Sequence, residues 1–269
     1  MISVTLGKMV SLCYNISIMK NYIVFDLEWN QSANGKERSI PHFPFEIIEI
    51  GAVKLNENFQ MTGEFHRLVR PQVYTQMHHA ISEVTHMNMK ELRNSGELFP
   101  NAATEFLAWC GEDAVFCTWG NMDLLELQRN MDYYHMENPF SKPLLYYDVQ
   151  KLYGLFCREN ARISLDSAVE EQKLMEERPF HRALDAAYYT GKLLTMLGQT
   201  PGPDAILPFW SVDYYRLPSD KKEEIRMTFP GYSKYVSRIF DSKEDAMADK
   251  GVTEMMCYRC GRMLRKKIR

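Results

Sequence analysis

The chain has 269 residues, a net charge of −3 and a hydrophobic content of 45%. This length supports one α/β domain of ordinary size together with an appendage. The acidic balance argues against a protein that coats long nucleic acid, because non-specific affinity for the phosphate backbone scales with the number of phosphates that Lys and Arg neutralise. It is compatible with a protein that contacts only the end of a nucleic-acid strand. It is also compatible with a site that concentrates carboxylates around a divalent metal ion.

The six cysteines are of two kinds. Cys257 and Cys260 form a C-x-x-C pair, whereas the others are scattered in apolar surroundings, at Cys13, Cys110, Cys117 and Cys157. Scattered cysteines in a long chain are typical of a reduced, intracellular protein, so we expect a cytoplasmic location. We expect no membrane span, since no segment has the apolar run of about eighteen residues that a span requires.

Residues 1–20 are predicted to be an N-terminal extension. Met19 is a candidate native start, because it stands just before the first predicted strand. A signal peptide is the alternative interpretation. Asn15 interrupts the apolar stretch and no clear small-residue cleavage site follows it, which disfavours a signal peptide.

The first three predicted strands form an antiparallel group. Residues 22–25 are β-branched and aromatic without polar alternation, which predicts a strand buried on both faces at the centre of a sheet. Residues 47–53 and 64–69 predict two further strands, and the short connections indicate antiparallel neighbours.

The pattern changes from Ser82 onward. A capped helix is predicted to begin at Asn101 and to end at Gly111, with Phe106, Leu107 and Cys110 inward. Strands and helices alternate after it: strand 114–118, helix 121–136, strand 146–149, and helices 149–157, 165–174 and 181–197. Three strands followed by this alternation predict an α/β fold with a mixed sheet flanked by helices.

A domain boundary is predicted at Thr200-Pro201-Gly202-Pro203, which cannot continue a helix. We therefore predict a main domain over residues 21–200 and a C-terminal extension over residues 201–269. The extension is polar and aromatic without a firm period. It ends in a basic cluster, Arg262, Arg265, Lys266, Lys267 and Arg269.

Asp26 and Glu28 lie two apart at the end of the first strand, so the strand's period of two places both carboxylates on one face. Two anions at the edge of a core repel each other, and one takes up a proton unless a cation neutralises them. A divalent ion is the simplest resolution, and oxygen ligands favour Mg²⁺ or Mn²⁺. The alternative is a carboxylate pair that faces solvent.

Three further polar residues join this pair. Asp123 is predicted in the first turn of a helix that directly follows a strand, where the ligands of a sheet gather. His181 and Asp185 are four apart on a predicted helix and share a face. A histidine beside metal-bound water is suited to accept a proton near neutral pH. The alternatives are a first-turn acid favoured by the helix dipole and a local His–Asp surface pair.

Together these positions form three ordered motifs: Phe25-Asp26-Leu27-Glu28, Trp119-Gly120-Asn121-Met122-Asp123 and His181-Arg182-Ala183-Leu184-Asp185. The signature resembles that of the DEDDh exonucleases of the ribonuclease H-like superfamily, which includes proofreading subunits, ribonuclease T and oligoribonuclease. Within it, Glu46-Ile47-Ile48-Glu49-Ile50-Gly51-Ala52-Val53 looks closest to the exonucleases that trim histone mRNA and small RNAs. The resemblance covers residues 21–197. It implies a ribonuclease H-like fold and 3′–5′ exonuclease activity on single-stranded RNA or DNA, with release of nucleoside 5′-monophosphates.

The resemblance also implies a site with two Mg²⁺ or Mn²⁺ ions. Asp26, Glu28 and Asp185 would hold one ion, and Asp26 would bridge to the second. Asp123 would act on that second ion. His181 would accept the proton of the attacking water.

Candidate substrate contacts follow from the same resemblance. Leu27 and Trp29, just after the first strand's acids, would contact the terminal nucleotide, although Trp29 as a core or rim residue is the alternative. Thr85 and His86 belong to the segment that replaces a Leu-Thr-Gly-Ile-like turn, which touches the last base in relatives. His86 stands where a glycine is common.

Two features of the extension suggest binding. Cys257 and Cys260 have the spacing of half a zinc knuckle, but no later Cys or His follows. Three interpretations are open: the pair binds Zn²⁺ with ligands from elsewhere, it belongs to a zinc ribbon whose second half is absent, or it is idle. Contact with nucleic acid by stacking and charge is expected from Tyr232, Lys234, Tyr235, Arg238 and the basic end. A partly ordered tail is the alternative.

Two other functions are open at this point. A non-catalytic nucleic-acid or protein-binding module of the same fold is one, but it has no need of the complete set of acids and histidine. A proofreading subunit bound to a polymerase is the other, and the sequence has no recognisable docking peptide. The choice between RNA and DNA is also open, because contacts to the 2′-hydroxyl depend on side-chain placement.

Overall fold

The computed structural model describes residues 21–34, 39–141, 143–158, 162–174, 178, 182–213, 215, 221–228 and 233–254. The predictions for residues 1–20, for His181 and for the pair Cys257 and Cys260 lie outside the described residues. The chain divides into two compact units, Ile18–Asp213 and a smaller unit made of Met1–Ser17 and Tyr214–Arg269. The larger unit thus runs past the Thr200-Pro201-Gly202-Pro203 segment.

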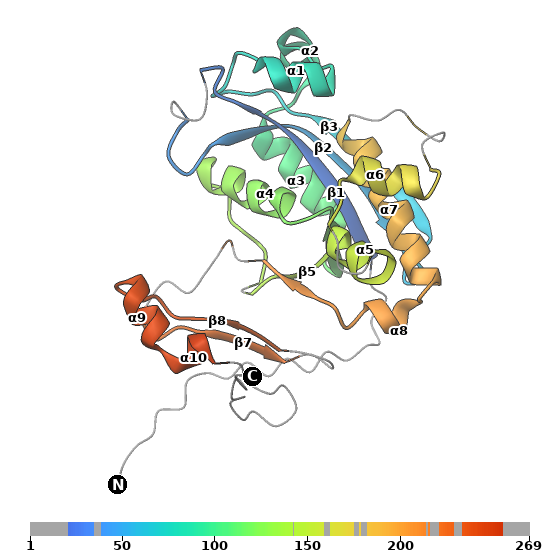
Figure 1. The fold of residues 1–269 in the computed structure, drawn as a ribbon. Coiled ribbons are helices and arrows are strands. Elements are labelled where there is room, and N and C mark those ends of the chain that lie inside the picture. Colours follow the sequence, from blue (N-terminus) through green and yellow to red (C-terminus); the bar gives the residue numbers. More distant parts are fainter. Residues whose placement is uncertain are drawn as a thin grey trace. The chain divides into compact units, whose positions relative to one another are not determined.

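A six-stranded mixed sheet forms the centre of the larger unit, in the order β3-β2-β1-β4-β5-β6 (Figure 1). Its strands are β1 Asn21–Gln31, β2 Phe45–Leu55, β3 Met61–Leu68, β4 Ala114–Thr118, β5 Leu145–Asp148 and β6 Ser211–Val212. β2 is antiparallel to both β1 and β3, and β4 is parallel to β1. The predicted mixed sheet and the predicted central place of the first strand are confirmed.

The helices of the larger unit are α1 His79–Thr85, α2 Met89–Ser95, α3 Phe99–Cys110, α4 Met122–Tyr133, α5 Val149–Cys157, α6 Leu165–Glu171, α7 Ala183–Gln199 and α8 Pro203–Ile206. The sequence did not predict α1 and α2, because helices of 7 residues are too short to show a clear helical period. α3 begins before the predicted Asn101, since Pro100 is tolerated in the first turn of a helix. No helix in the described part of the chain combines the length and apolar character needed to cross a bilayer.

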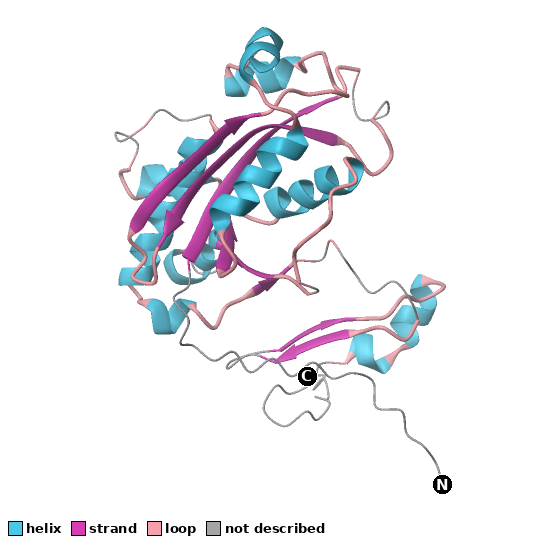
Figure 2. Cartoon of the chain, turned by 180° about the vertical axis from the view of Figure 1, so that it is seen from behind, coloured by secondary structure: helices cyan, strands magenta, loops and turns pink. Residues whose placement is uncertain are grey.

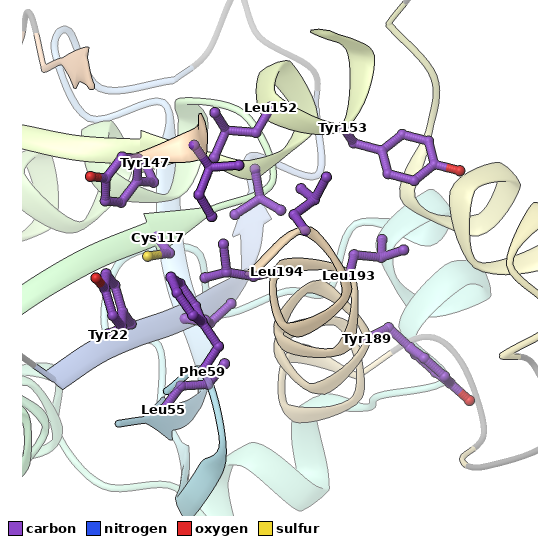
Figure 3. Packing of buried hydrophobic residues seen from close by; sticks show 14 of the residues in the cluster. Tyr22, Leu55, Phe59, Cys117, Tyr147, Leu152, Tyr153, Tyr189, Leu193 and Leu194 are labelled. Atoms are coloured by element: carbon purple, nitrogen blue, oxygen red, sulfur yellow. The ribbon is translucent and has the colours of Figure 1, made fainter. Parts of the chain in front are cut away.

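Helices cover both faces of the sheet (Figure 2). On one face, Tyr22 and Val24 of β1 belong to a core shared with α5, α6 and α7 (Figure 3). On the other face, Ile23, Phe25 and Leu27 belong to a core shared with α3 and α4. Both faces of β1 are therefore buried, as the apolar run predicted, and the even-numbered side chains of this strand face α7.

One edge of β1 is only partly covered by its parallel neighbour. Within the described residues, β4 pairs with β1 over Asn21–Val24 and no further. α4 follows β4 and is attached to the sheet through Asn130, whose side chain accepts the Ile47 N–H at 3.0 Å and donates to the Phe45 carbonyl at 3.0 Å. The edge beyond Val24 is thus open to side chains delivered by α4.

α7 makes backbone contact with the sheet at Gly51 of β2. A Cβ atom on Gly51 would lie 2.1 Å from the backbone nitrogen of Leu184 and 2.2 Å from the carbonyl carbon of Ala183. Any residue other than glycine therefore forces the first turn of α7 away. Gly51 is also the ladder partner of Asp26, so this turn lies over the part of the sheet that carries Asp26.

The smaller unit contains an antiparallel hairpin of β7 Ile225–Thr228 and β8 Ser233–Val236, followed by α9 Lys243–Ala248 and α10 Lys250–Thr253. Three of its described cations are paired with acids of the same unit. Lys221 contacts Asp241, Arg226 contacts Glu224 at 3.1 Å and Arg238 contacts Asp249 at 2.9 Å. Arg238, one of the residues expected to contact nucleic acid, is therefore engaged within its own unit.

The first prediction concerns Gly51. We expect Gly51→Ala to lower the free energy of unfolding by about 3 kcal/mol, because the added methyl group meets backbone atoms that cannot rotate away. Gly63→Ala is the matched control on β3, since its Cβ would meet only the Trp109 side chain, at 3.7 Å. Urea denaturation of both variants measures the difference. Equal stability of the two variants would contradict the close approach of α7.

Candidate active site

Asp26 and Glu28 lie on the face of β1 that α7 covers. Both are only partly buried, whereas Leu27 between them faces the opposite core and is 3% exposed. β1 and β2 pair in regular register up to Glu28, which lies opposite Glu49. The register shifts directly after this pair. β1 therefore places both carboxylates on one face, as the spacing in the sequence predicted.

Asp123 reaches the same strand from the first turn of α4. Its Oδ1 accepts the Leu27 N–H at 3.1 Å, in a buried hydrogen bond. This N–H points to the open edge of β1, so the carboxylate takes the place of the strand that β4 does not supply. Asp123 therefore lies next to the residue that separates Asp26 from Glu28.

The three acids affect one another's protonation. Burial, together with the charges of Asp123 and Glu28, holds the pKa of Asp26 well above its usual range. Burial, followed by the charge of Glu49, raises the pKa of Glu28 to about 8. Burial raises the pKa of Asp123 to about 7, although the Leu27 N–H lowers it. No Lys or Arg among the described residues forms a salt bridge with any of the three.

Glu49 of β2 is a fourth acid whose role the sequence did not reveal. It is fully buried. Its carboxylate contacts His66 Nε2 at 2.6 Å, accepts a hydrogen bond from Arg182 Nε at 2.9 Å and accepts the Ala183 N–H at 3.1 Å. Burial acts to raise the pKa of Glu49, but these hydrogen bonds lower it. Glu49 thus stays ionised and caps the start of α7. The only signal in the sequence was a single carboxylate inside the apolar run 47–53.

Asp185 lies in the first turn of α7. Burial raises the pKa of Asp185, whereas the charges of Arg178 and Arg182 lower it. The charge of Glu49 raises the pKa of both Asp185 and Asp26. The turn that carries Asp185 meets the sheet at Gly51, the ladder partner of Asp26.

The three clustered acids fit a divalent cation in kind. They are carboxylate oxygen donors of one sign, which is the donor set that Mg²⁺ and Mn²⁺ prefer. Within the described residues, no three His, Cys, Asp or Glu side chains converge closely enough to hold a metal ion. Charges act over longer distances than metal–oxygen bonds of about 2 Å. The acids thus lie within electrostatic reach of one another without meeting at one point.

The predicted substrate contacts lie in two places. Leu27 supplies its backbone N–H to Asp123, and its side chain is in the core. Trp29 packs at the margin of the same core, with its ring centroid 5.6 Å from that of Phe45. Thr85 is buried at the end of α1, and His86 is the exposed cap that follows. His86 has φ of 56°, a conformation that glycine adopts freely, which explains why glycine suits this position.

Two residues of the proposed nucleic-acid surface in the smaller unit are engaged within that unit. The Arg226 guanidinium lies 4.4 Å from the centroid of the Tyr235 ring. Arg238 donates to Asp249 and lies over the Phe240 ring, 4.5 Å from its centroid. The side chains of Tyr232 and Lys234 are outside the described residues. Nothing in these contacts reserves Tyr235 or Arg238 for a nucleic acid.

Comparisons with known proteins place this site in a class. Residues 23–194 match the sequence model of the RNase T family, described as exonuclease. A probable 3′–5′ exonuclease, KapD of Bacillus subtilis, is 26% identical over 178 residues, which are 66% of this chain and 84% of that protein.

Solved structures share the fold. The nuclease domain of 3′hExo, a DEDDh family member bound to rAMP, superposes with a TM-score of 0.57 at 21% identity, covering 69% of this chain and 95% of that domain. Exonuclease I of E. coli in complex with a dA16 oligonucleotide has a TM-score of 0.54 at 14% identity, covering 67% of this chain and 41% of that protein. The ribonuclease H-like fold predicted from the sequence is confirmed.

The fold and the family match define an exonuclease of ribonuclease H-like fold. The chain belongs to the RNase T exonuclease family. It is thereby a member of the DEDDh 3′–5′ exonuclease superfamily that the three sequence motifs resembled.

The second prediction concerns stability and pH without metal. Carboxyls whose pKa is raised by folding stabilise the folded state while protonated, and that stability is lost as pH rises toward the folded pKa. For Glu28 this window runs from its ordinary 4.5 to about 8. We expect the chelator-treated protein to unfold at lower urea concentration at pH 8 than at pH 6, and Mg²⁺ to restore stability at pH 8.

Asp26→Asn is the companion variant, because it removes one of the repelling charges and keeps the shape of the side chain. We expect it to be more stable than the wild type at pH 8 in chelator and to respond less to pH. A variant less stable than the wild type under these conditions would contradict mutual repulsion among the three acids.

Proposed function

We propose that this protein hydrolyses single-stranded RNA or DNA one nucleotide at a time from the 3′ end and releases nucleoside 5′-monophosphates. One observation carries the proposal: three acids, the partly buried Asp26 and Glu28 and the buried Asp123, share the open edge of β1 and form no salt bridge among the described residues. Such a group of like charges lowers stability unless cations bind there. It would repel phosphate in a protein that only binds nucleic acid.

Divalent metal ions of the Mg²⁺ or Mn²⁺ type are the cations that suit these donors. Asp26 and Glu28 would hold them from β1, and Asp123 from α4. Bound there, such ions polarise the scissile phosphate and lower the pKa of water. The number of ions, predicted as two from the resemblance, is part of the proposal.

The other roles in the proposed site are carried out by side chains and backbone groups of the protein itself. Leu27 holds the Asp123 carboxylate in place through its N–H. Glu49 fixes the start of α7, and Arg182 neutralises Glu49 at 2.8 Å. His181, which directly precedes Arg182 in the sequence, would accept the proton of the attacking water. Its neutral imidazole suits that step near pH 7.

Single-stranded nucleic acid is the substrate class that the relatives support. One solved relative is described with rAMP and another with a dA16 oligonucleotide, so ribose and deoxyribose both occur within the superfamily. We therefore propose activity on single strands and leave the preferred sugar to experiment. Terminal-nucleotide contacts from Leu27, Trp29, Thr85 and His86 are part of this proposal.

The third prediction is the activity itself. 5′-labelled single-stranded RNA and DNA of equal length are incubated with the protein in Mg²⁺, in Mn²⁺ or in chelator. We expect a ladder that shortens from the 3′ end, requires the metal and falls at least about a thousandfold in Asp26→Asn. Cleavage that persists in chelator, or in the variant, would contradict the proposed site.

The fourth prediction concerns Asp185, which we propose, as the resemblance implies, to be a metal ligand. The first turn of α7, which carries Asp185, meets the sheet at Gly51, the ladder partner of Asp26. We expect Asp185→Asn to lower the single-turnover rate of 3′-end cleavage at least about a hundredfold. A rate within about tenfold of the wild type would show that Asp185 is not a ligand.

A further inference from the structure

Residues 72–78 connect β3 to α1 and have no regular secondary structure. We refer to them as the tether. Irregular segments usually satisfy their backbone polar groups with water. In the tether these groups are instead satisfied by side chains from other elements, which makes it a fixed part of the fold.

Glu46 of β2 holds the first part of the tether. Its carboxylate is fully buried. It accepts the backbone N–H groups of Gln72 at 2.6 Å, Val73 at 3.0 Å and Tyr74 at 2.7 Å, and the hydroxyl of Tyr134 at 2.6 Å. A buried carboxylate costs stability unless its oxygens are fully hydrogen-bonded, and here the tether supplies most of the donors.

Asn30 of β1 holds the second part. It is fully buried. Its Nδ2 donates to the carbonyls of Tyr74 at 2.8 Å and Gln76 at 2.9 Å, and its Oδ1 accepts the His78 N–H at 3.0 Å. Two donors and one acceptor are used together, which among side chains of this size only an amide provides.

The tether leads into a small cap made of α1 and α2. Ile48 has no partner on β1 at the register shift. Its side chain is buried with Met87 and Leu92 in a separate small core beneath these helices. Arg93 of α2 also donates to the Thr75 carbonyl of the tether, at 3.1 Å. The cap is thus attached at several points, and Asn30 is the attachment that lies on the strand of Asp26 and Glu28.

We propose that Asn30 is a positioning residue for substrate binding. Through the tether it sets the distance between the acids of β1 and the turn at Thr85 and His86, so that a terminal nucleotide held at that turn places its phosphate at the acids. The inference rests on the proposed function, since it assumes that this turn contacts the substrate. It assigns to Asn30 a role in holding the nucleotide rather than in the chemical step.

The physical reason for this role is the conformational order of the protein before substrate binds. Substrate binding is tighter when the contacting groups are ordered beforehand, because less conformational entropy is lost in the complex. Removing the Asn30 amide leaves two carbonyls and one N–H without partners and releases the second part of the tether. The loss of order therefore weakens substrate binding. Once the complex has formed, its phosphate lies at the same acids, so the chemical step is little changed.

The test compares Asn30→Leu with Gln128→Met. Gln128 is a matched control, since it is a buried amide with three hydrogen bonds, to Leu124, Asp213 and Asn138, none of them in the tether. We expect Asn30→Leu to raise KM for a single-stranded oligonucleotide about tenfold and to change kcat less than about threefold. Fluorescence anisotropy in chelator, where no cleavage occurs, is expected to show the same weakening of Kd. Gln128→Met is expected to lower stability and to leave KM and Kd within about twofold.

Several results would overturn the proposal. One is a KM for Asn30→Leu that matches that of Gln128→Met, and another is a loss of kcat with KM unchanged. If Asn30→Leu does not fold, Arg93→Met decides, because it removes an exposed attachment of the tether: a KM raised about threefold supports the proposal and an unchanged KM rejects it. Wild-type cleavage in the same assay separates these outcomes from failure of the proposed function.

Discussion

Mutual repulsion among neighbouring acids is the constraint around which the larger unit is organised. Asp26 and Glu28 are set by the alternation of β1, and Asp123 is bound to the N–H between them. A structure selected for stability alone would pair these charges or expose them to water. Instead, the strand that would cover this edge of β1 ends its pairing at Val24, and a helix delivers a further acid. The arrangement leaves an electrostatic repulsion among the acids, which a bound cation would reduce.

Two residues of β2 support the site by holding the start of α7. Gly51 lets the first turn of α7 reach the backbone of the sheet, and Glu49, two residues earlier on the same face, accepts the first N–H of that helix. The positive end of the α7 dipole is thereby aimed at the acids of β1. Glu49 remains ionised among His66 and Arg182, whereas its ladder partner Glu28 has a raised pKa. Neighbouring carboxylates on two strands thus differ in charge because their hydrogen-bond donors differ.

The sequence predicted β1 to β5, their order along the chain and the common face of Asp26 and Glu28, because these follow from local periodicity, but not the short strands β6, β7 and β8. It did not predict α1 and α2, which are short, nor the roles of Glu49 and Gly51, which depend on a helix more than 130 residues away in the chain. The role of Asp185 stays a prediction. Asp185 lies in the first turn of α7, whose contact with the sheet depends on Gly51, and this is a tertiary contact that spacing in the sequence does not contain.

One strand of the sheet serves two purposes. Up to Glu28 the ladder of β1 and β2 is regular and directs acids toward α7. At the register shift that follows, β2 carries the extra residue, Ile48, and its side chain enters the small core beneath α1 and α2. β1 has no extra residue, so its alternation continues and Asn30 lies on the same face as Asp26 and Glu28. The acids and the attachment of the tether therefore follow one face of β1, with Glu28 and Asn30 two residues apart.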